Sequence, residues 1–285
     1  MPPRIAIPMP HSTDHEYGER AIPQYERAVT LAGGEPLRIP LDLTAADVKS
    51  LIERCDAVLL PGSNADIDPA RFNQPRSPHS AAPDPRRDEV DGLLLADAYD
   101  RRKPVLGICY GLQSLNVFRK GSLVQHIPDF LQEGTRSKIN HEAGKKVAIA
   151  HTVDIEPTSL LAEVVCRDSR PRLSGRTQLE AVEGETNRGG HGFSRAASEP
   201  KTQTTLAAQA TELVLSVNSS HHQSADAIGD GLRIVARCPD DDIVEALEGT
   251  SPDHFVLAVQ WHPERSVDDD AASRAIFRAL IEAAR

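Results

Sequence analysis

Cys109, in the middle of the chain, has the surroundings that make a thiol nucleophilic. In Lys103-Pro-Val-Leu-Gly-Ile-Cys-Tyr-Gly-Leu-Gln113 an apolar run typical of a buried strand gives way at once to a helical pattern, with the cysteine between Gly107 and Gly111. A helix N-terminus stabilises a thiolate, which is the reactive form of cysteine. Glycines suit such a turn because a Cβ would clash where strand and helix meet. The alternative is an inert buried thiol.

His262 is the best candidate for the base that this thiol needs. In Ala258-Val-Gln-Trp-His-Pro-Glu264 an apolar strand ends at the histidine, and Glu264 follows two residues later. An extended backbone would put both side chains on one side. A carboxylate beside an imidazole selects its tautomer and stabilises the imidazolium formed when the thiol loses its proton. The alternative is a surface His-Pro-Glu turn.

Attack of a thiolate on a carbonyl also requires donors for the oxyanion that forms. The backbone N–H of Tyr110 is left pointing toward such an oxyanion when a strand turns directly into a helix. The loop Leu60-Pro-Gly-Ser63 is the candidate source of a second donor. We therefore predict an oxyanion hole formed by Gly62, Ser63 and Tyr110.

Another polar cluster, Val217-Asn-Ser-Ser-His-His-Gln223, is interpreted as a loop that faces the substrate. His221 and His222 are adjacent, so on a strand they would point to opposite faces, and no Asp, Glu or Cys partner has ligand spacing. We therefore predict no metal site and no cofactor. Four further histidines are expected at the surface: His11, His15, His79 and His254.

Composition limits the class of protein. The net charge of −10 over 285 residues argues against binding of nucleic acid or an anionic membrane and favours a small-molecule substrate. No apolar run approaches the roughly 18 residues of a membrane span, and Arg4-Ile-Ala-Ile-Pro8 resembles a first core strand rather than a signal peptide. The four cysteines show no CxxC spacing, so we expect free thiols and a cytoplasmic location. Homo-oligomerisation stays open.

Alternating strand and helix patterns in the first half predict βαβ units and a parallel sheet. The expected strands are 4–10, 35–41, 57–60 and 104–108, and the expected helices are 22–32, 44–55, 88–101 and 111–118. The second half is β-rich, with strands expected at 146–155, 214–217, 232–237, 243–247 and 255–260 and a closing helix at 270–284. Loops at the carboxyl ends of such strands hold ligands in open α/β sheets.

The chain is expected to form a single domain, 1–285, with one insertion. Residues 167–209 are rich in Arg, Ser, Gly, Thr and Gln and have little periodicity. Such a segment buries too little apolar surface to offset its ordering entropy, so we expect a disordered or surface insertion. The alternative is a lid or a partner-binding loop.

Six motifs together resemble the class I glutamine amidotransferase superfamily, and more closely its γ-glutamyl-γ-aminobutyrate hydrolase family, which is also assigned to the cysteine peptidases. They are Tyr25-x-x-Ala-Val-x-x-Ala-Gly-Gly34, Leu60-Pro-Gly62 with Asp66-Ile-Asp-Pro69, Asp84-Pro-x-Arg-Asp88, Gly107-Ile-Cys-Tyr-Gly-Leu-Gln113, Val217-Asn-Ser-x-His-x-Gln223 and Val259-Gln-Trp-His-Pro-Glu264. Ser63 stands where members of the family often have a second glycine.

This resemblance implies an α/β fold: a flavodoxin-like three-layer sandwich with a mostly parallel central sheet, a nucleophile elbow and a β-rich C-terminal half. It also implies Cys109 as nucleophile, His262 as base and Glu264 as its orienting partner. Residues implied to lie near a bound glutamyl group are Gln113, Asn218, Ser219, Ser220 and His221.

The function expected from these residues is hydrolysis of γ-glutamyl amides through a thioester on Cys109, without metal or cofactor. The departing amine is aminobutyrate, a polyamine of polyamine catabolism, or another conjugate. One alternative is a glutaminase subunit that supplies ammonia to a separate synthase. Another is a non-catalytic binding or regulatory member of the family.

Overall fold

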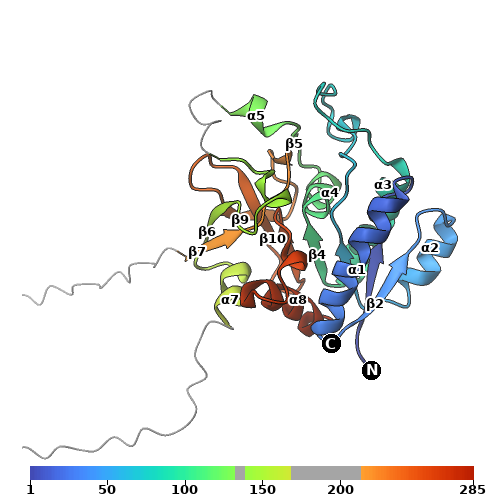
Figure 1. The fold of residues 1–285 in the computed structure, drawn as a ribbon. Coiled ribbons are helices and arrows are strands. Elements are labelled where there is room, and N and C mark those ends of the chain that lie inside the picture. Colours follow the sequence, from blue (N-terminus) through green and yellow to red (C-terminus); the bar gives the residue numbers. More distant parts are fainter. Residues whose placement is uncertain (132–138, 168–212) are drawn as a thin grey trace, which may run out of the picture.

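A mixed sheet lies between two layers of helices in the computed structural model, which describes residues 1–131, 139–167 and 213–285 (Figure 1). In this part of the chain the sheet has nine strands in the order β2-β1-β3-β4-β11-β10-β9-β6-β7. Their bounds are β1 Arg4–Pro8, β2 Glu35–Ile39, β3 Ala57–Leu60, β4 Val105–Ile108, β6 His151–Ile155, β7 Leu213–Val217, β9 Leu232–Arg237, β10 Val244–Gly249 and β11 Val256–Val259. A small second sheet pairs β5 (Leu123–Val124) with β8 (Ser224–Ala225).

The strands divide into a parallel and an antiparallel half. β2, β1, β3, β4 and β11 pair in parallel, whereas β10, β9, β6 and β7 pair antiparallel. The α/β class, the parallel first half and the β-rich second half are thus confirmed. Strand β11 crosses from the second half to pair with β4, which brings the two ends of the predicted site to one edge.

Each face of the sheet has its own helical layer and its own core. The helices are α1 His15–Leu31, α2 Ala45–Ile52, α3 Pro85–Arg101, α4 Tyr110–Phe118, α5 Ile127–Phe130, α7 Leu160–Arg167 and α8 Ala271–Ala283. Ile5 and Ile7 pack with α1, α7 and α8, while Ala6 between them packs with α2, α3 and α4. Side chains alternate across a strand, so a run of apolar residues such as β3 feeds both cores.

Several element boundaries differ from those expected. Helix α1 begins at His15 rather than 22, because the Asp14 carboxylate accepts the N–H of Tyr17 and caps the helix well before Pro23. Strand β6 begins at His151 rather than 146, and helix α7 was not predicted. The expected insertion over 167–209 lies outside the described residues except for Arg167. Among the described helices, none is long and apolar enough to cross a bilayer.

Candidate active site

The nucleophile elbow forms as the glycines predicted. Cys109 is the N-cap of α4 and has φ 54° and ψ −106°, a left-handed backbone conformation that is strained for a residue with a side chain. A Cβ on Gly111 would lie 2.2 Å from the carbonyl oxygen of Leu60, and one on Gly107 would lie 2.9 Å from the carbonyl oxygen of Gly111. Only glycine permits this approach of helix to strands.

Parallel pairing of β4 with β11 brings the base to the thiol. Val259 lies opposite Ile108, and the Cys109 N–H donates to Val259 O at 2.8 Å, so both chains leave the sheet at the same edge. His262 follows three residues after Val259, and its side chain lines the same pocket as the Cys109 thiol, with His262 Cε1 and Cys109 Cβ 3.1 and 3.7 Å from the position that a Cβ on Gly62 would take. The predicted meeting of residues 109 and 262 across one crevice is therefore present in the structure.

The carboxylate of Glu264 backs the imidazole of His262. Glu264 Oε1 accepts from Nδ1 of His262 at 2.7 Å, which leaves the opposite ring nitrogen for the thiol. Burial opposes charge on the imidazole, but the Glu264 carboxylate and the Cys109 thiol more than offset it and raise the pKa of His262 to about 9. Burial likewise opposes charge on Glu264, but His262 and Arg265 lower the pKa of its carboxyl. The arrangement therefore favours an imidazolium beside the sulfur.

Asn218 holds the backbone of His262 rather than facing a substrate. Its Nδ2 donates to His262 O at 2.8 Å, and its Oδ1 accepts from His262 N at 2.9 Å. Ser219 is fully buried, with its hydroxyl 3.5 Å from Glu245 Oε2. Neither residue lines the pocket, so the expectation that they contact a glutamyl group is corrected. Their side chains turn inward because the loop packs against β10 and the His262 turn.

A pocket of about 530 Å³ opens over Cys109. The predicted site residues in its wall are Ser63, Cys109, Tyr110, Gln113, Ser220, His221, His262 and Glu264. The wall also carries the ionisable groups of Arg20, Asp66 and Arg265, which sequence reasoning did not single out. Each lies on or beside a motif, but nothing in the local sequence signals that the three side chains converge.

The Gly62 amide does not face the thiol. Its N–H donates to the Tyr25 hydroxyl at 3.0 Å, so its expected role as an oxyanion donor is corrected: this donor already has a buried partner. Ser63, the next residue, lines the pocket, and its hydroxyl accepts from Ala65 N at 3.1 Å. Tyr110 is the first residue of α4, where helical N–H groups have no partner within the helix. Ser63 and Tyr110 are left as the two candidate main-chain donors.

Arg87 supports this edge of the site and was missed as a functional residue, although it lies in the Asp84 to Asp88 motif. Its side chain is fully buried, and its Nε donates to Asp91 at 2.7 Å. Its NH2 group donates to Pro61 O at 2.7 Å, and its guanidinium stacks 4.8 Å from the centre of the Tyr110 ring. One cation therefore contacts both the loop after β3 and the first residue of α4, on either side of Cys109.

His254 is the exception among the histidines expected at the surface. Only 8% of it is exposed, and its Nε2 donates to Lys103 O at 2.8 Å. Its ring also meets the ring of Tyr99 edge-on, with centroids 5.1 Å apart. The expectation is wrong for His254 because it follows a turn that folds back onto β4.

Comparison with known proteins decides the family. The Peptidase C26 family model matches residues 5–174 and 183–264, which includes every residue of the proposed Cys-His-Glu group. The chain belongs to the Peptidase C26 family. This match confirms the resemblance to cysteine peptidase-type, glutamine amidotransferase-like proteins and places the chain among glutamine amidotransferase-like hydrolases.

Individual relatives agree with this assignment. The chain is 30% identical to a glutamine amidotransferase-like protein of Rickettsia prowazekii, over 92% of this chain and 88% of that protein. It is 28% identical to γ-glutamyl-γ-aminobutyrate hydrolase PuuD of Escherichia coli K12, over 91% of this chain and 84% of that protein. The fold is similar to that of the glutaminase domain of Trypanosoma brucei CTPS with bound acivicin, with a TM-score of 0.53, 16% identity and coverage of 98% and 93%.

Proposed function

We propose that the chain hydrolyses γ-glutamyl amides with Cys109, His262 and Glu264 as its catalytic triad. The observation that carries this proposal is the left-handed Cys109 at the start of α4, in the same pocket as an imidazole whose Nδ1 is paired with Glu264 at 2.7 Å. The three side chains line one pocket. A nucleophile, a base and an orienting carboxylate in this order are the parts that acyl transfer needs.

The mechanism follows from these positions. The Cys109 thiolate attacks the γ-carbonyl carbon, and the N–H groups of Ser63 and Tyr110 stabilise the oxyanion of the tetrahedral intermediate. The His262 imidazolium gives its proton to the departing amine, which leaves a glutamyl thioester on the sulfur. Water, deprotonated by the same imidazole, attacks the thioester and releases glutamate and the thiolate.

The charges of the pocket wall support an amino acid substrate. A γ-glutamyl group carries an α-carboxylate and an α-ammonium, and the wall offers both signs: Arg20 and Arg265 as cations and Asp66 as a buried anion. Asp66 accepts from Ala81 N at 2.7 Å and pairs with His222 at 3.0 Å, so its carboxylate is held in one orientation. We assign the ammonium to the Asp66 side of the pocket and the carboxylate to the arginines.

A second candidate function is delivery of ammonia from glutamine to a separate synthase. The name of the Rickettsia relative as a glutamine amidotransferase-like protein favours it. The two functions differ in the amine that leaves and in whether a partner is required. Turnover of γ-glutamyl amines by the chain alone supports the hydrolase, whereas glutamine turnover that begins only with a second protein supports the subunit.

Intact-mass spectrometry of the enzyme during turnover tests the triad. Across a panel of γ-glutamyl amines and free glutamine, we expect a glutamyl adduct that maps to Cys109. Cys109→Ser should stay folded without forming the thioester, and Cys166→Ser is the matched control because that thiol lies on α7, outside the pocket wall. Normal turnover by Cys109→Ser, or an adduct on another cysteine, refutes the proposed mechanism.

A further inference from the structure

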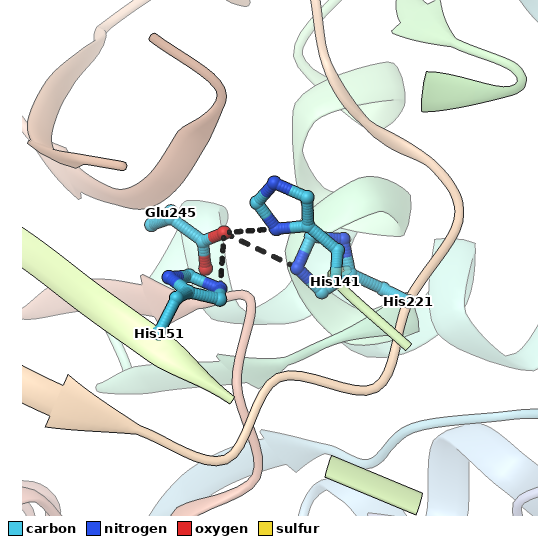
Figure 2. A group of neighbouring side chains, drawn as sticks. All are labelled: His141, His151, His221 and Glu245. Carbon is cyan, nitrogen blue, oxygen red and sulfur yellow. Dashed lines mark ion pairs between the residues drawn. The ribbon is translucent and has the colours of Figure 1, made fainter. Parts of the chain in front are cut away.

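Three histidines and one glutamate meet inside the protein (Figure 2), and one of them, His221, also lines the pocket. They come from four separate segments: His141 precedes the 3₁₀ turn Ala143–Lys145, His151 begins β6, His221 lies between β7 and β8, and Glu245 is on β10. All are buried, with no more than 6% of any residue exposed. Local ligand spacing could not reveal this group, because the segments are distant in sequence.

One carboxylate oxygen is the centre of the group. Glu245 Oε1 lies 3.0 Å from His141 Nδ1, 3.4 Å from His151 Nε2 and 3.2 Å from His221 Nε2. All four atoms lie within 4.8 Å of one another. The three rings thus turn one nitrogen each toward a single carboxylate oxygen, as Figure 2 shows.

The opposite nitrogen of each ring has an acceptor of its own. His151 Nδ1 lies 2.9 Å from Thr152 O, and His221 Nδ1 lies 2.9 Å from Gln223 O. A carbonyl only accepts, so these two nitrogens carry the ring protons. His141 Nε2 is likewise 2.8 Å from the Asp241 carboxylate. If the rings are neutral, three lone pairs therefore face one carboxylate oxygen.

Such an arrangement is repulsive unless a positive charge lies between the four atoms. Protonation of His141 alone, between the carboxylates of Asp241 and Glu245, would still leave the lone pairs of His151 and His221 facing the Glu245 oxygen. Protonation of every ring would place three imidazolium charges in a buried site against these two carboxylates, leaving a net buried charge. One carboxylate oxygen also has too few lone pairs for three N–H donors. A metal ion satisfies all four atoms at once, and an outer acceptor on each ring is typical of histidines that bind metals.

We propose that His141, His151, His221 and Glu245 bind one zinc ion as a structural site. Zinc lies about 2.0–2.2 Å from imidazole nitrogen and carboxylate oxygen, so tetrahedral ligand atoms lie about 3.4 Å apart. The three distances of 3.0–3.4 Å to Glu245 Oε1 fit that spacing. Four protein ligands leave no open position, which is the pattern of a structural rather than a catalytic site.

The ion would fix one wall of the substrate pocket. His221 lines the pocket, and its backbone N–H donates to the backbone carbonyl oxygen of His141 at 2.9 Å. Asn218, three residues earlier, holds the backbone of His262. Metal binding therefore ties the 218–221 loop to β6 and β10, and loss of the metal should loosen the pocket wall.

Metal binding by the untagged, full-length protein tests the site. After removal of metal and dialysis against buffered zinc, we expect one zinc per chain by elemental mass spectrometry, and cobalt should give the visible absorption of a tetrahedral ion. His151→Asn should weaken zinc binding by at least about 100-fold, and Asp241→Asn, which replaces the charged outer partner of His141 by a neutral amide, by about 10- to 100-fold. His79→Asn is the matched control, because His79, His126 and Asp129 form a second group near the surface.

Three results would overturn the proposal: no zinc or cobalt bound by the wild-type protein, full affinity in His151→Asn, or loss of zinc in His79→Asn. If His151→Asn does not fold, the cobalt spectrum of the wild type and the affinity of Asp241→Asn decide in the same way. A wild-type protein that binds no metal would mean that protons shared between the three imidazoles and the Glu245 carboxylate hold the four side chains together.

Discussion

Replacing Arg87 by methionine is expected to destabilise the fold strongly, because it leaves the buried Asp91 carboxylate without its cation. Arg87 and Asp91 are paired at 2.7 Å on one face of α3, and neither side chain has any exposure. The substitution also removes the donors to Pro10 O and Pro61 O and the cation stacked on the Tyr110 ring. Methionine fills much of the volume, so the effect reports charge and hydrogen bonding rather than a cavity.

The magnitude follows from the uncompensated charge. Breaking a fully buried ion pair by removal of one partner destabilises a protein by about 3–5 kcal/mol. Domains of about 150–250 residues lose about 2–4 °C of Tm for each kcal/mol, so the expected fall is about 6–20 °C. The double variant Arg87→Met with Asp91→Leu should recover part of this loss, because no carboxylate is then left unpaired. Recovery stays incomplete because the Pro10 and Pro61 carbonyls still lack their donor.

Urea denaturation and calorimetry of the single and double variants measure the effect. Arg101→Met is the matched control: Arg101 pairs with Asp97 on the same helix at the same spacing, but half of its side chain is exposed. That exposed pair should contribute less than about 1 kcal/mol. An Arg87→Met protein as stable as Arg101→Met, or a double variant no more stable than the single one, would refute the reasoning.

Three further changes probe the site. Glu264→Gln should lower kcat on the order of 10⁴-fold. Because this carboxylate raises the pKa of the His262 imidazole, the fall of activity at high pH should begin at lower pH in the variant, and an unchanged pH profile would contradict this. Gly111→Ala should lower both Tm and activity, because the added Cβ would lie 2.2 Å from a main-chain oxygen of β3. Gly92→Ala should lower neither, because a Cβ at that position meets no atom within 4 Å. Tyr25→Phe leaves the buried Gly62 N–H without its partner and should destabilise the fold by about 1–3 kcal/mol, seen by calorimetry as a lower Tm.

The position of the candidate active site at one edge of the sheet was predictable because its sequence signals are local. The strand ending at Cys109 and the strand ending at His262 each showed an apolar run followed by a polar residue. Parallel strands deliver their carboxyl ends to one edge, so the meeting of thiol and imidazole followed once both runs were assigned. The role of Gly107 and Gly111 was equally predictable, because a sharp turn from strand to helix brings backbone segments so close that a side chain would clash.

Other features depend on contacts that the local sequence does not encode. The direction of the Gly62 amide is set by Tyr25, a residue 37 positions away on α1. Asn218 carries the right chemistry to bind a substrate, yet its amide is used on the backbone of His262. The convergence of His151 and Glu245 arises from strand pairings across the antiparallel half, and His141 joins them from the loop before β6; sequence patterns do not specify either.

The hydrogen bond from Cys109 N to Val259 O has a consequence for how substrate preference changes in this family. The Cys109 sulfur and the His262 imidazole follow directly after β4 and β11, which are hydrogen-bonded neighbours in one sheet. The two groups therefore keep their relative positions and need no closing motion to meet. The walls opposite them, on α1 and in the 63–66 loop, are separate parts. Mutation can therefore reshape the opening of the pocket while the positions of Cys109 and His262 relative to each other are kept.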